Sequence, residues 1–121
     1  MLKIGEYTRI NGKIGKVKDI VLNGNNYEDS GIYLENEKFI LGKEEIYKLK
    51  SSYNIIDLIE VGDYVNGLLV TRIYFDEEAN KKYLNLYGSV SEWEEEDIKT
   101  ILTKEQYENN CYKVDDKQED I

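Results

Sequence analysis

The fold follows from the stretch Ile4-Gly-Glu-Tyr-Thr-Arg-Ile-Asn-Gly12 near the start of the chain. Ile4 and Ile10 are an even number of residues apart, so they face the same side of an extended strand. Asn11-Gly12 is the preferred pair for a type I′ turn, because both central positions need φ > 0. Residues 13–22 then return as a second strand rich in β-branched residues. The stretch therefore predicts an antiparallel hairpin.

The same pattern of an apolar residue, a glycine, an acid and a tyrosine returns at Val61-Gly-Asp-Tyr64. Each copy leads into an Asn-Gly turn, which in the second copy is Asn66-Gly67. Residues 68–75 and 82–87 then form a second predicted hairpin around a turn at 76–80. The repeated pattern indicates a duplicated, barrel-like β unit.

The rest of the chain contains short apolar runs broken by Gly, Asn and Asp. The apolar phase slips between Ile14 and Val17, which predicts a bulge near Gly15. Residues 54–58 are too few to distinguish a strand from a single helical turn. Loop-forming residues fill positions 23–31. Further short strands are expected at 32–35, 39–41, 46–49, 98–102 and 111–114.

The end of the chain contains the one clear helix signal. Thr103 and Gln106 have capping-box spacing, which predicts a helix of about two turns over residues 104–110. The predicted fold is therefore mainly β, with two small SH3-like, barrel-like antiparallel β units and one short C-terminal helix. The units are expected at residues 1–50 and 51–114, followed by a flexible acidic tail at 115–121.

The composition of this 121-residue chain limits its chemistry. Histidine is absent, which removes the commonest general base and the usual zinc ligand. The single cysteine, Cys111, permits no internal disulfide and has no activating neighbour in sequence. The phosphate-binding motifs Gly-x-x-x-x-Gly-Lys and Gly-x-Gly-x-x-Gly are both absent. Two of the many carboxylates could still meet in space and act as acid and base, but no pair stands out. We therefore expect a binding protein rather than an enzyme, with no catalytic residue, no metal site and no cofactor.

Two further features bear on origin and location. No apolar run approaches the ~20 residues of a membrane span, and the first residues lack the apolar core of a signal peptide. The expectation is a cytoplasmic protein without membrane contact. Lys, Ile, Asn, Tyr and Glu are abundant, whereas Ala79 is the only alanine and Arg9 and Arg72 are the only arginines. The favoured residues have AT-rich codons, which indicates a gene from a low-GC bacterium or one of its phages.

The net charge of −9 is distributed unevenly. Residues 1–18 carry five basic side chains and one acidic side chain, so the rest of the chain is strongly acidic. An acidic body repels phosphate backbones and suits basic partners. We therefore expect no direct binding of bulk nucleic acid. The expected partner is a host protein with a basic nucleic-acid-binding surface.

The run Glu92-Trp-Glu-Glu-Glu-Asp97 is the most unusual local feature. Its carboxylates could stand in for phosphates around an exposed indole and be gripped by an Arg/Lys groove. The run could also be a solvated segment with Trp93 packed against the barrel. Neither this run nor Asp76-Glu-Glu78 has the spacing of a calcium loop. The candidate partner-binding residues are Glu92, Trp93, Glu94, Glu95, Glu96 and Asp97, supported by Asp76, Glu77 and Glu78.

Eleven tyrosines suggest a different site. Aromatic side chains on small barrels stack nucleic-acid bases, and the basic N-terminal hairpin would supply phosphate contacts. Such a site could hold a nucleotide signal or single-stranded nucleic acid. The opposing interpretation is ordinary strand packing and sheet surface. The alternative ligand-binding residues are Tyr7, Arg9, Lys13, Lys16 and Tyr64.

Three segments resemble small proteins of clostridial and related Firmicute phages and prophages. They are Ser51-Ser-Tyr-Asn-Ile-Ile-Asp-Leu-Ile-Glu-Val-Gly-Asp-Tyr-Val-Asn-Gly67, Ile101–Glu108 with Tyr112–Val114, and the opening Ile4–Lys16. The resemblance implies a phage origin and brings no catalytic residue. By analogy with small acidic phage proteins, it implies a non-enzymatic inhibitor of a host system such as restriction or CRISPR. A phage structural or assembly component is the third possibility, and exposed edge strands could support a homodimer.

Overall fold

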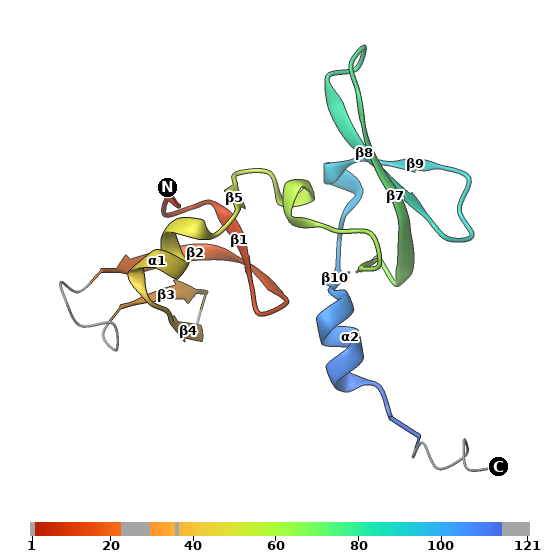
Figure 1. Ribbon diagram of the computed structural model, residues 1–121. Coiled ribbons are helices and arrows are strands. Elements are labelled where there is room, and N and C mark those ends of the chain that lie inside the picture. The colour runs from red at the N-terminus through yellow and green to blue at the C-terminus, as the bar shows by residue number, and fades with distance from the viewer. Residues whose placement is uncertain (1, 23–29, 36, 115–121) are drawn as a thin grey trace.

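The structure is a computed structural model that describes residues 2–22, 30–35 and 37–114. Figure 1 shows two β units, one in each half of the chain, followed by a helix that leads to the C-terminus. Most of the loop predicted at 23–31, and all of the tail predicted at 115–121, lie outside the described residues.

The first unit is a sheet of five strands, β1 (Tyr7–Ile10), β2 (Lys13–Val21), β3 (Gly31–Leu34), β4 (Glu37–Ile40) and β5 (Ser51–Ser52). All neighbours are antiparallel, in the order β4-β3-β2-β1-β5. A short helix, α1 (Lys43–Lys48), lies between β4 and β5. The last strand therefore returns to pair with the first, with Tyr7 opposite Ser52.

The second unit is a sheet of β6 (Tyr64–Val65), β7 (Leu68–Asp76), β8 (Lys81–Leu86), β9 (Glu92–Trp93) and β10 (Ile101–Leu102). Its neighbours are antiparallel, in the order β10-β6-β7-β8-β9. A 3-10 turn, η3 (Glu95–Asp97), lies between β9 and β10. Another 3-10 turn, η2 (Ile55–Leu58), joins the two units, and α2 (Lys104–Asn110) follows the second.

The two sheets have the same topology. In each, four strands form a meander, a helical segment follows, and the fifth strand pairs with the first. Both sheets are open, because β4 and β5 end one order and β9 and β10 end the other. The prediction of a mainly β chain with two small antiparallel units is confirmed. The sheets change over between Ser52 and the buried Ile56, a few residues after the boundary expected near Lys50.

The repeated apolar-Gly-acid-Tyr pattern marks the same turn in each unit. Gly5 has φ +94° and Gly62 has φ +101°, values in the left-handed region that favours glycine. The Gly5 N–H donates to the Val17 carbonyl over 2.9 Å, and the Gly62 N–H donates to the Val70 carbonyl over 3.0 Å. The pattern therefore encodes the point where each unit's first strand meets its second.

The acid of the pattern closes this turn in both units. The Glu6 carboxylate accepts the Lys3 backbone N–H over 2.6 Å, and the Asp63 carboxylate accepts the Glu60 backbone N–H over 2.8 Å. In each case the acceptor lies three residues after the donor, as in the bond from an N-cap N–H to the N3 side chain of a capping box. The sequence echo is therefore a structural repeat.

Both Asn-Gly turns have the predicted conformation. Asn11 and Gly12 have φ values of +50° and +79°, and Asn66 and Gly67 have φ values of +52° and +82°. Two consecutive positive φ angles define a type I′ turn, whose twist matches the strands it connects. The two predicted hairpins are confirmed.

The bulge predicted near Gly15 is misplaced. Pairing of β1 with β2 runs through Gly15 without interruption, and the register shift lies between Val17 and Asp19, where β2 pairs with β3. A Cβ at position 15 would lie 3.1 Å from the Leu34 Cβ, so close packing explains this glycine. The second unit repeats the shift, between Val70 and Arg72.

Three predicted segments differ in the structure. Residues 46–49 were expected as a strand, but α1 occupies most of them, and its single buried side chain, Ile46, gives no helical periodicity to read. The strand expected at 98–102 is reduced to β10, and residues 111–114 form no strand. Residues 54–58 adopt the helical alternative, as η2. The C-terminal helix is confirmed, with Thr103 and Gln106 in a capping box.

Each unit has its own hydrophobic core. The first core contains Leu2, Ile10, Val17, Ile32, Leu34 and Ile46. The second contains Ile56, Ile59, Val65, Val70, Leu84 and Leu86. The apolar side chain of Ile14, in β2 of the first unit, also packs against the second core. The chain therefore has two cores rather than one shared core.

Candidate functional site

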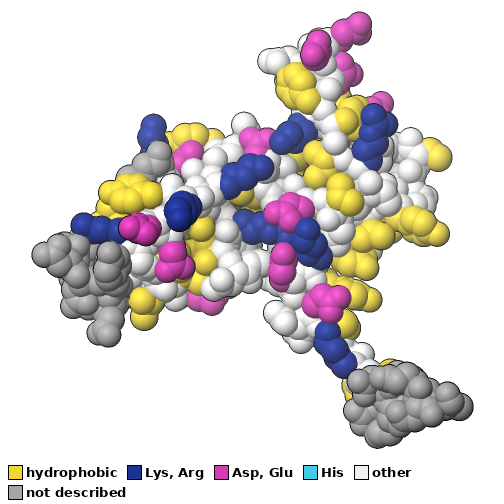
Figure 2. Space-filling model, viewed as in Figure 1, with side chains coloured by type: hydrophobic (Ala, Val, Ile, Leu, Met, Phe, Trp, Pro, Cys, Tyr) yellow, Lys and Arg dark blue, Asp and Glu magenta, His cyan; other side chains and the backbone are white. Residues whose placement is uncertain are grey.

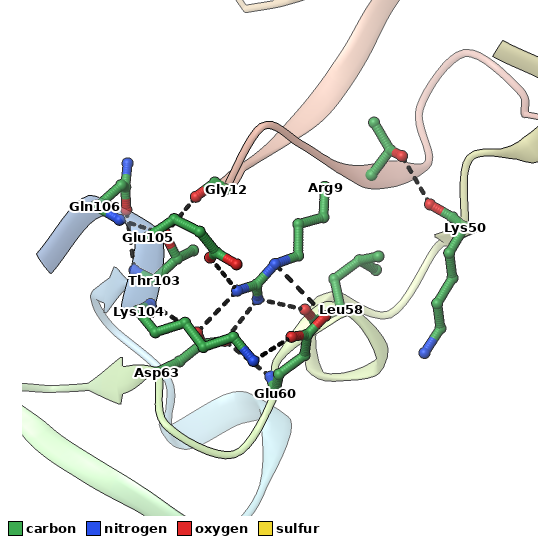
Figure 3. Close-up of polar contacts among 11 residues, drawn as sticks. Arg9, Gly12, Lys50, Leu58, Glu60, Asp63, Thr103, Lys104, Glu105 and Gln106 are labelled. Atoms are coloured by element: carbon green, nitrogen blue, oxygen red, sulfur yellow. Dashed lines mark hydrogen bonds and ion pairs between the residues drawn. The ribbon is translucent and has the colours of Figure 1, made fainter. Parts of the chain in front are cut away.

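A buried ion pair joins the two units (Figure 3). Arg9 extends from β1, and its side chain is 10% exposed. Its Nη1 donates to Asp63 Oδ2 over 2.6 Å and its Nη2 donates to Asp63 Oδ1 over 2.9 Å. Nη1 also donates to the Leu58 carbonyl, and Nη2 to Glu105 Oε1. All these acceptors belong to η2 or to the second unit, so one arginine spans the junction.

Asp63 is saturated with donors. Its side chain is fully buried, and besides Arg9 its oxygens accept the backbone N–H groups of Glu60 and Lys104 over 2.8 and 2.9 Å. Burial acts to raise the pKa of Asp63, but these hydrogen bonds outweigh it and hold the pKa below its ordinary value. Asp63 therefore stays ionised beside the guanidinium.

The turn between β1 and β2 packs against the start of α2. The Thr103 hydroxyl donates to the Gly12 carbonyl while its oxygen accepts the Gln106 N–H. A side chain at position 12 would collide with Glu105, so this glycine also permits close approach. We call the contacts of Arg9, Gly12, Asp63, Thr103 and Glu105 the joint. It fixes one unit against the other, and it removes Arg9 from the set of residues free to bind a ligand.

The predicted acidic run, residues 92–97, covers β9 and η3, and we call this surface segment the ridge. Glu94 pairs with Lys81 over 2.7 Å, and Asp97 accepts the Glu94 backbone N–H over 2.9 Å. Glu95 accepts the Ile56 backbone N–H over 3.2 Å. Glu96 is exposed, and among the described residues its carboxylate has no hydrogen bond or ion pair. The run therefore divides into carboxylates that hold the backbone and a carboxylate that is open to solvent.

Trp93 packs against the second core. It is half-buried, and its Nε1 donates to the Ser89 hydroxyl over 3.1 Å. For Trp93, the structure therefore agrees with the second interpretation of the acidic run, in which the indole packs against the sheet. Glu92 lies beside it on β9 and is exposed.

The supporting acids lie at the tip of the β7–β8 hairpin, where Figure 2 shows Asp and Glu side chains gathered. Asp76 Oδ1 accepts the backbone N–H groups of Glu78 and Ala79 over 3.0 and 3.4 Å, which stabilises the turn. Glu77 and Glu78 are exposed. This tip is distant in the sequence from η3. Lys81, at the start of β8 next to the tip, pairs with Glu94 of the ridge.

A cleft of about 440 Å³, which we call the hairpin cleft, lies between the ridge, η2 and the β7–β8 hairpin. Lys81 pairs with Glu94 over 2.7 Å and Lys82 pairs with Asp57 over 2.9 Å. Glu95 and Glu96 also line the cleft. Its apolar part includes the Phe75 side chain, which is 54% exposed.

A second cleft of about 580 Å³, the joint cleft, lies between the two units on the other side of the ridge. It contains Tyr7 and Lys13 of the alternative ligand-binding set, together with Tyr53. Lys13 is already paired with Glu37. Glu95 and Glu96 line this cleft too, so the ridge separates two hollows.

The other three residues of the alternative set, Lys16, Arg9 and Tyr64, do not line the joint cleft. Lys16 Nζ lies 5.3 Å from the centroid of the Tyr7 ring, and Arg9 is buried in the joint. Tyr64 stacks on Tyr107 at a centroid distance of 4.9 Å in a different hollow. The structure therefore brings only Tyr7, Lys13 and Lys16 of this set together.

Sequence analysis did not identify Phe75 or the role of Asp63. Asp63 carried a signal, since it is the acid of the repeated pattern, but that signal indicates a turn and not a partner. Phe75 carried none, because an aromatic residue in a strand is ordinary.

The described residues contain no group of three or more His, Cys, Asp or Glu that could hold a metal ion. No helix in the described part of the chain is long and apolar enough to cross a membrane. A comparison of the chain with protein-family models, curated proteins and solved structures finds no match.

Proposed function

We propose that this protein is a phage-encoded, non-enzymatic inhibitor that binds a host nucleic-acid-handling protein and blocks its access to nucleic acid. The observation that carries the proposal is the ridge at η3. It places Glu96, which has no ion pair among the described residues, between two clefts. Glu92 is exposed on the adjoining strand. The net charge of −9 favours association with a basic surface.

The mechanism would be steric and electrostatic. Carboxylates at Glu92 and Glu96 would occupy positions that phosphates take on the partner, and complementary charge raises the rate of encounter. The joint supports this role because Arg9, held by Asp63, Leu58 and Glu105, fixes the two units that form the joint cleft against each other. A preformed surface loses less conformational entropy when it binds.

The first experiment is affinity purification from a low-GC Firmicute lysate, with and without nuclease, followed by mass spectrometry. We expect a nucleic-acid-handling protein whose recovery is unchanged by nuclease. Addition of the purified chain should then displace labelled nucleic acid from that protein. Recovery that disappears after nuclease treatment would contradict the proposal.

The second experiment tests the ridge. The double variant Glu92→Gln/Glu96→Gln should weaken binding to the recovered protein by at least about fivefold, because neither carboxylate has a hydrogen bond or ion pair among the described residues. The matched control is Glu35→Gln/Glu44→Gln, which removes the same charge from exposed positions in the first unit. Equal loss in both variants would show that net charge, and not the ridge, determines affinity.

A second candidate function is binding of a nucleotide signal or single-stranded nucleic acid in the joint cleft. The observation in its favour is that Tyr7, Tyr53 and Lys13 line one hollow. Glu95 and Glu96 on the same wall would repel phosphate, so this candidate ranks second. Direct binding of an oligonucleotide that weakens as salt rises would support it.

A further inference from the structure

The hairpin cleft has an aromatic wall for a structural reason. Phe75 and Ile73 are two residues apart on β7, so they face the same side of the sheet, the side that covers the second core. Ile73 is opposite the buried Leu84, whereas Phe75 is opposite Lys82 and lies where the hairpin extends beyond the core. The Phe75 ring is therefore 54% exposed, on the face that covers the core and next to Lys82.

The charges of the cleft do not cancel. Its two lysines are each paired with a carboxylate, Lys81 with Glu94 and Lys82 with Asp57. Glu95 uses one oxygen to accept the Ile56 N–H, and neither Glu95 nor Glu96 forms an ion pair among the described residues. An exposed ring thus shares a cleft of about 440 Å³ with two carboxylates that, within the described part of the chain, belong to no ion pair.

We infer that the hairpin cleft binds an arginine side chain of the protein partner, with the guanidinium stacked on Phe75 and paired with Glu96. This inference rests on the proposed function and names the chemical group that the partner inserts. A guanidinium is planar and weakly hydrated, so it stacks on aromatic rings and pairs with carboxylates in two-point geometry, which an ammonium does not.

Both interactions, arginine stacked on an aromatic ring and arginine paired with a carboxylate at two points, already occur within the chain. The Arg72 guanidinium lies 4.6 Å from the centroid of the Tyr74 ring, and Arg9 forms a two-point pair with Asp63. These are the only two arginines of the chain, and both are engaged. In a second copy Arg9 is buried and Arg72 already stacks on Tyr74, so the inference commits to an arginine from a different protein.

The test uses the full chain and three acetylated pentapeptide amides. Their sequences are Gly-Arg-Gly-Arg-Gly and the same peptide with lysine or with neutral citrulline in place of arginine. Binding is followed by ¹H–¹⁵N chemical-shift titration. We expect the arginine peptide to bind about three- to tenfold more tightly than the lysine peptide and the citrulline peptide not to bind. The largest shifts should occur at Phe75, Glu95 and Glu96.

Two pairs of variants separate the ring from the charge. Phe75→Ala should reduce the affinity for arginine to that for lysine, whereas Tyr87→Ala, which removes a 71%-exposed ring on the same hairpin's far end, should not. Glu96→Gln should weaken both cationic peptides, whereas Glu44→Gln, an exposed acid of the first unit outside the cleft, should have little effect. Unchanged far-UV and near-UV circular dichroism would show that each variant is folded.

Equal affinity for the arginine and lysine peptides, or equal losses for Glu44→Gln and Glu96→Gln, would overturn the inference. The proposed function would survive that result if the recovered host protein still depended on the ridge in the double-variant experiment. Conversely, arginine selectivity in the cleft together with a ridge-independent host protein would leave the inference and reject the proposed function.

Discussion

The two units have the same strand order and the same turn, but they use the acid of that turn differently. In the first unit Glu6 accepts the Lys3 N–H and a Ser51 hydroxyl near the surface. In the second unit Asp63 is fully buried and also accepts two bonds from Arg9. A residue that closes a local turn in one copy has become the centre of the joint in the other. The comparison shows how a repeat can acquire a new role without changing its local structure.

The units also differ in what they expose. The β7–β8 hairpin extends beyond its core and ends in acidic residues, and both clefts are lined by the second unit's η3. The first unit contributes Arg9 and the turn at Gly12 to the joint. We conclude that the second unit carries the candidate binding surface and that the first unit supports it.

The largest expected difference between the units concerns these two acids. Asp63→Ala leaves the buried Arg9 guanidinium without its carboxylate, which should lower the free energy of unfolding by about 3–5 kcal/mol. Glu6→Ala removes two hydrogen bonds near the surface and should lower it by about 1 kcal/mol. Urea denaturation measures both. Equal losses would mean that the joint contributes nothing beyond the local turn.

The second comparison uses the equivalent glycines of the two Asn-Gly turns. Gly12→Ala combines backbone strain at φ +79° with a collision against Glu105, and should lower the free energy of unfolding by about 3 kcal/mol. Gly67→Ala has similar strain at φ +82° but nothing within 4 Å, and should lower it by about 1–2 kcal/mol. The two variants differ only if the first turn packs against α2, so equal values would contradict the joint.

The third expectation is a pH dependence that belongs to the second unit. The pKa of Asp63 is lower in the folded protein than its unfolded value of about 3.9, so its ionisation stabilises the fold above that pH. This stabilisation is lost as the pH falls below about 4 and through the folded-state pKa, because the folded protein must then take up a proton. Urea denaturation at pH 7 and pH 3 should show a smaller loss for Asp63→Asn than for the wild type.

The smallest expected effect concerns exposed ion pairs, one in each unit. Lys13 pairs with Glu37 in the first unit and Lys81 pairs with Glu94 in the second, and all four side chains are partly exposed. Exposed pairs contribute little because water and salt screen them. Lys13→Ala and Lys81→Ala should both leave the thermal midpoint nearly unchanged. A clear loss in Lys81→Ala alone would mean that the ridge depends on this pair for its conformation.

The sequence predicted part of the candidate site. That the acidic run is the partner-binding segment stays a prediction, while η3 places Glu95 and Glu96 on the walls of two clefts. The sequence did not distinguish Glu94 and Asp97, which hold η3 in place, from Glu96, which is open to solvent. Adjacent acids look alike in a sequence, because their roles depend on which backbone groups and cations fold next to them.

Local chemistry determined the elements whose conformation depends on neighbouring residues. The positive φ angles of the two Asn-Gly turns and the capping box at Thr103 depend on only a few residues, and both were predicted from the sequence. Only the tertiary structure decided the rest. Helix α1 forms where Ile46 packs into the first core, and Arg9 reaches Asp63, which lies 54 positions along the chain. Such contacts join residues that are distant in sequence, and burial supplies their energy, so no local pattern records them.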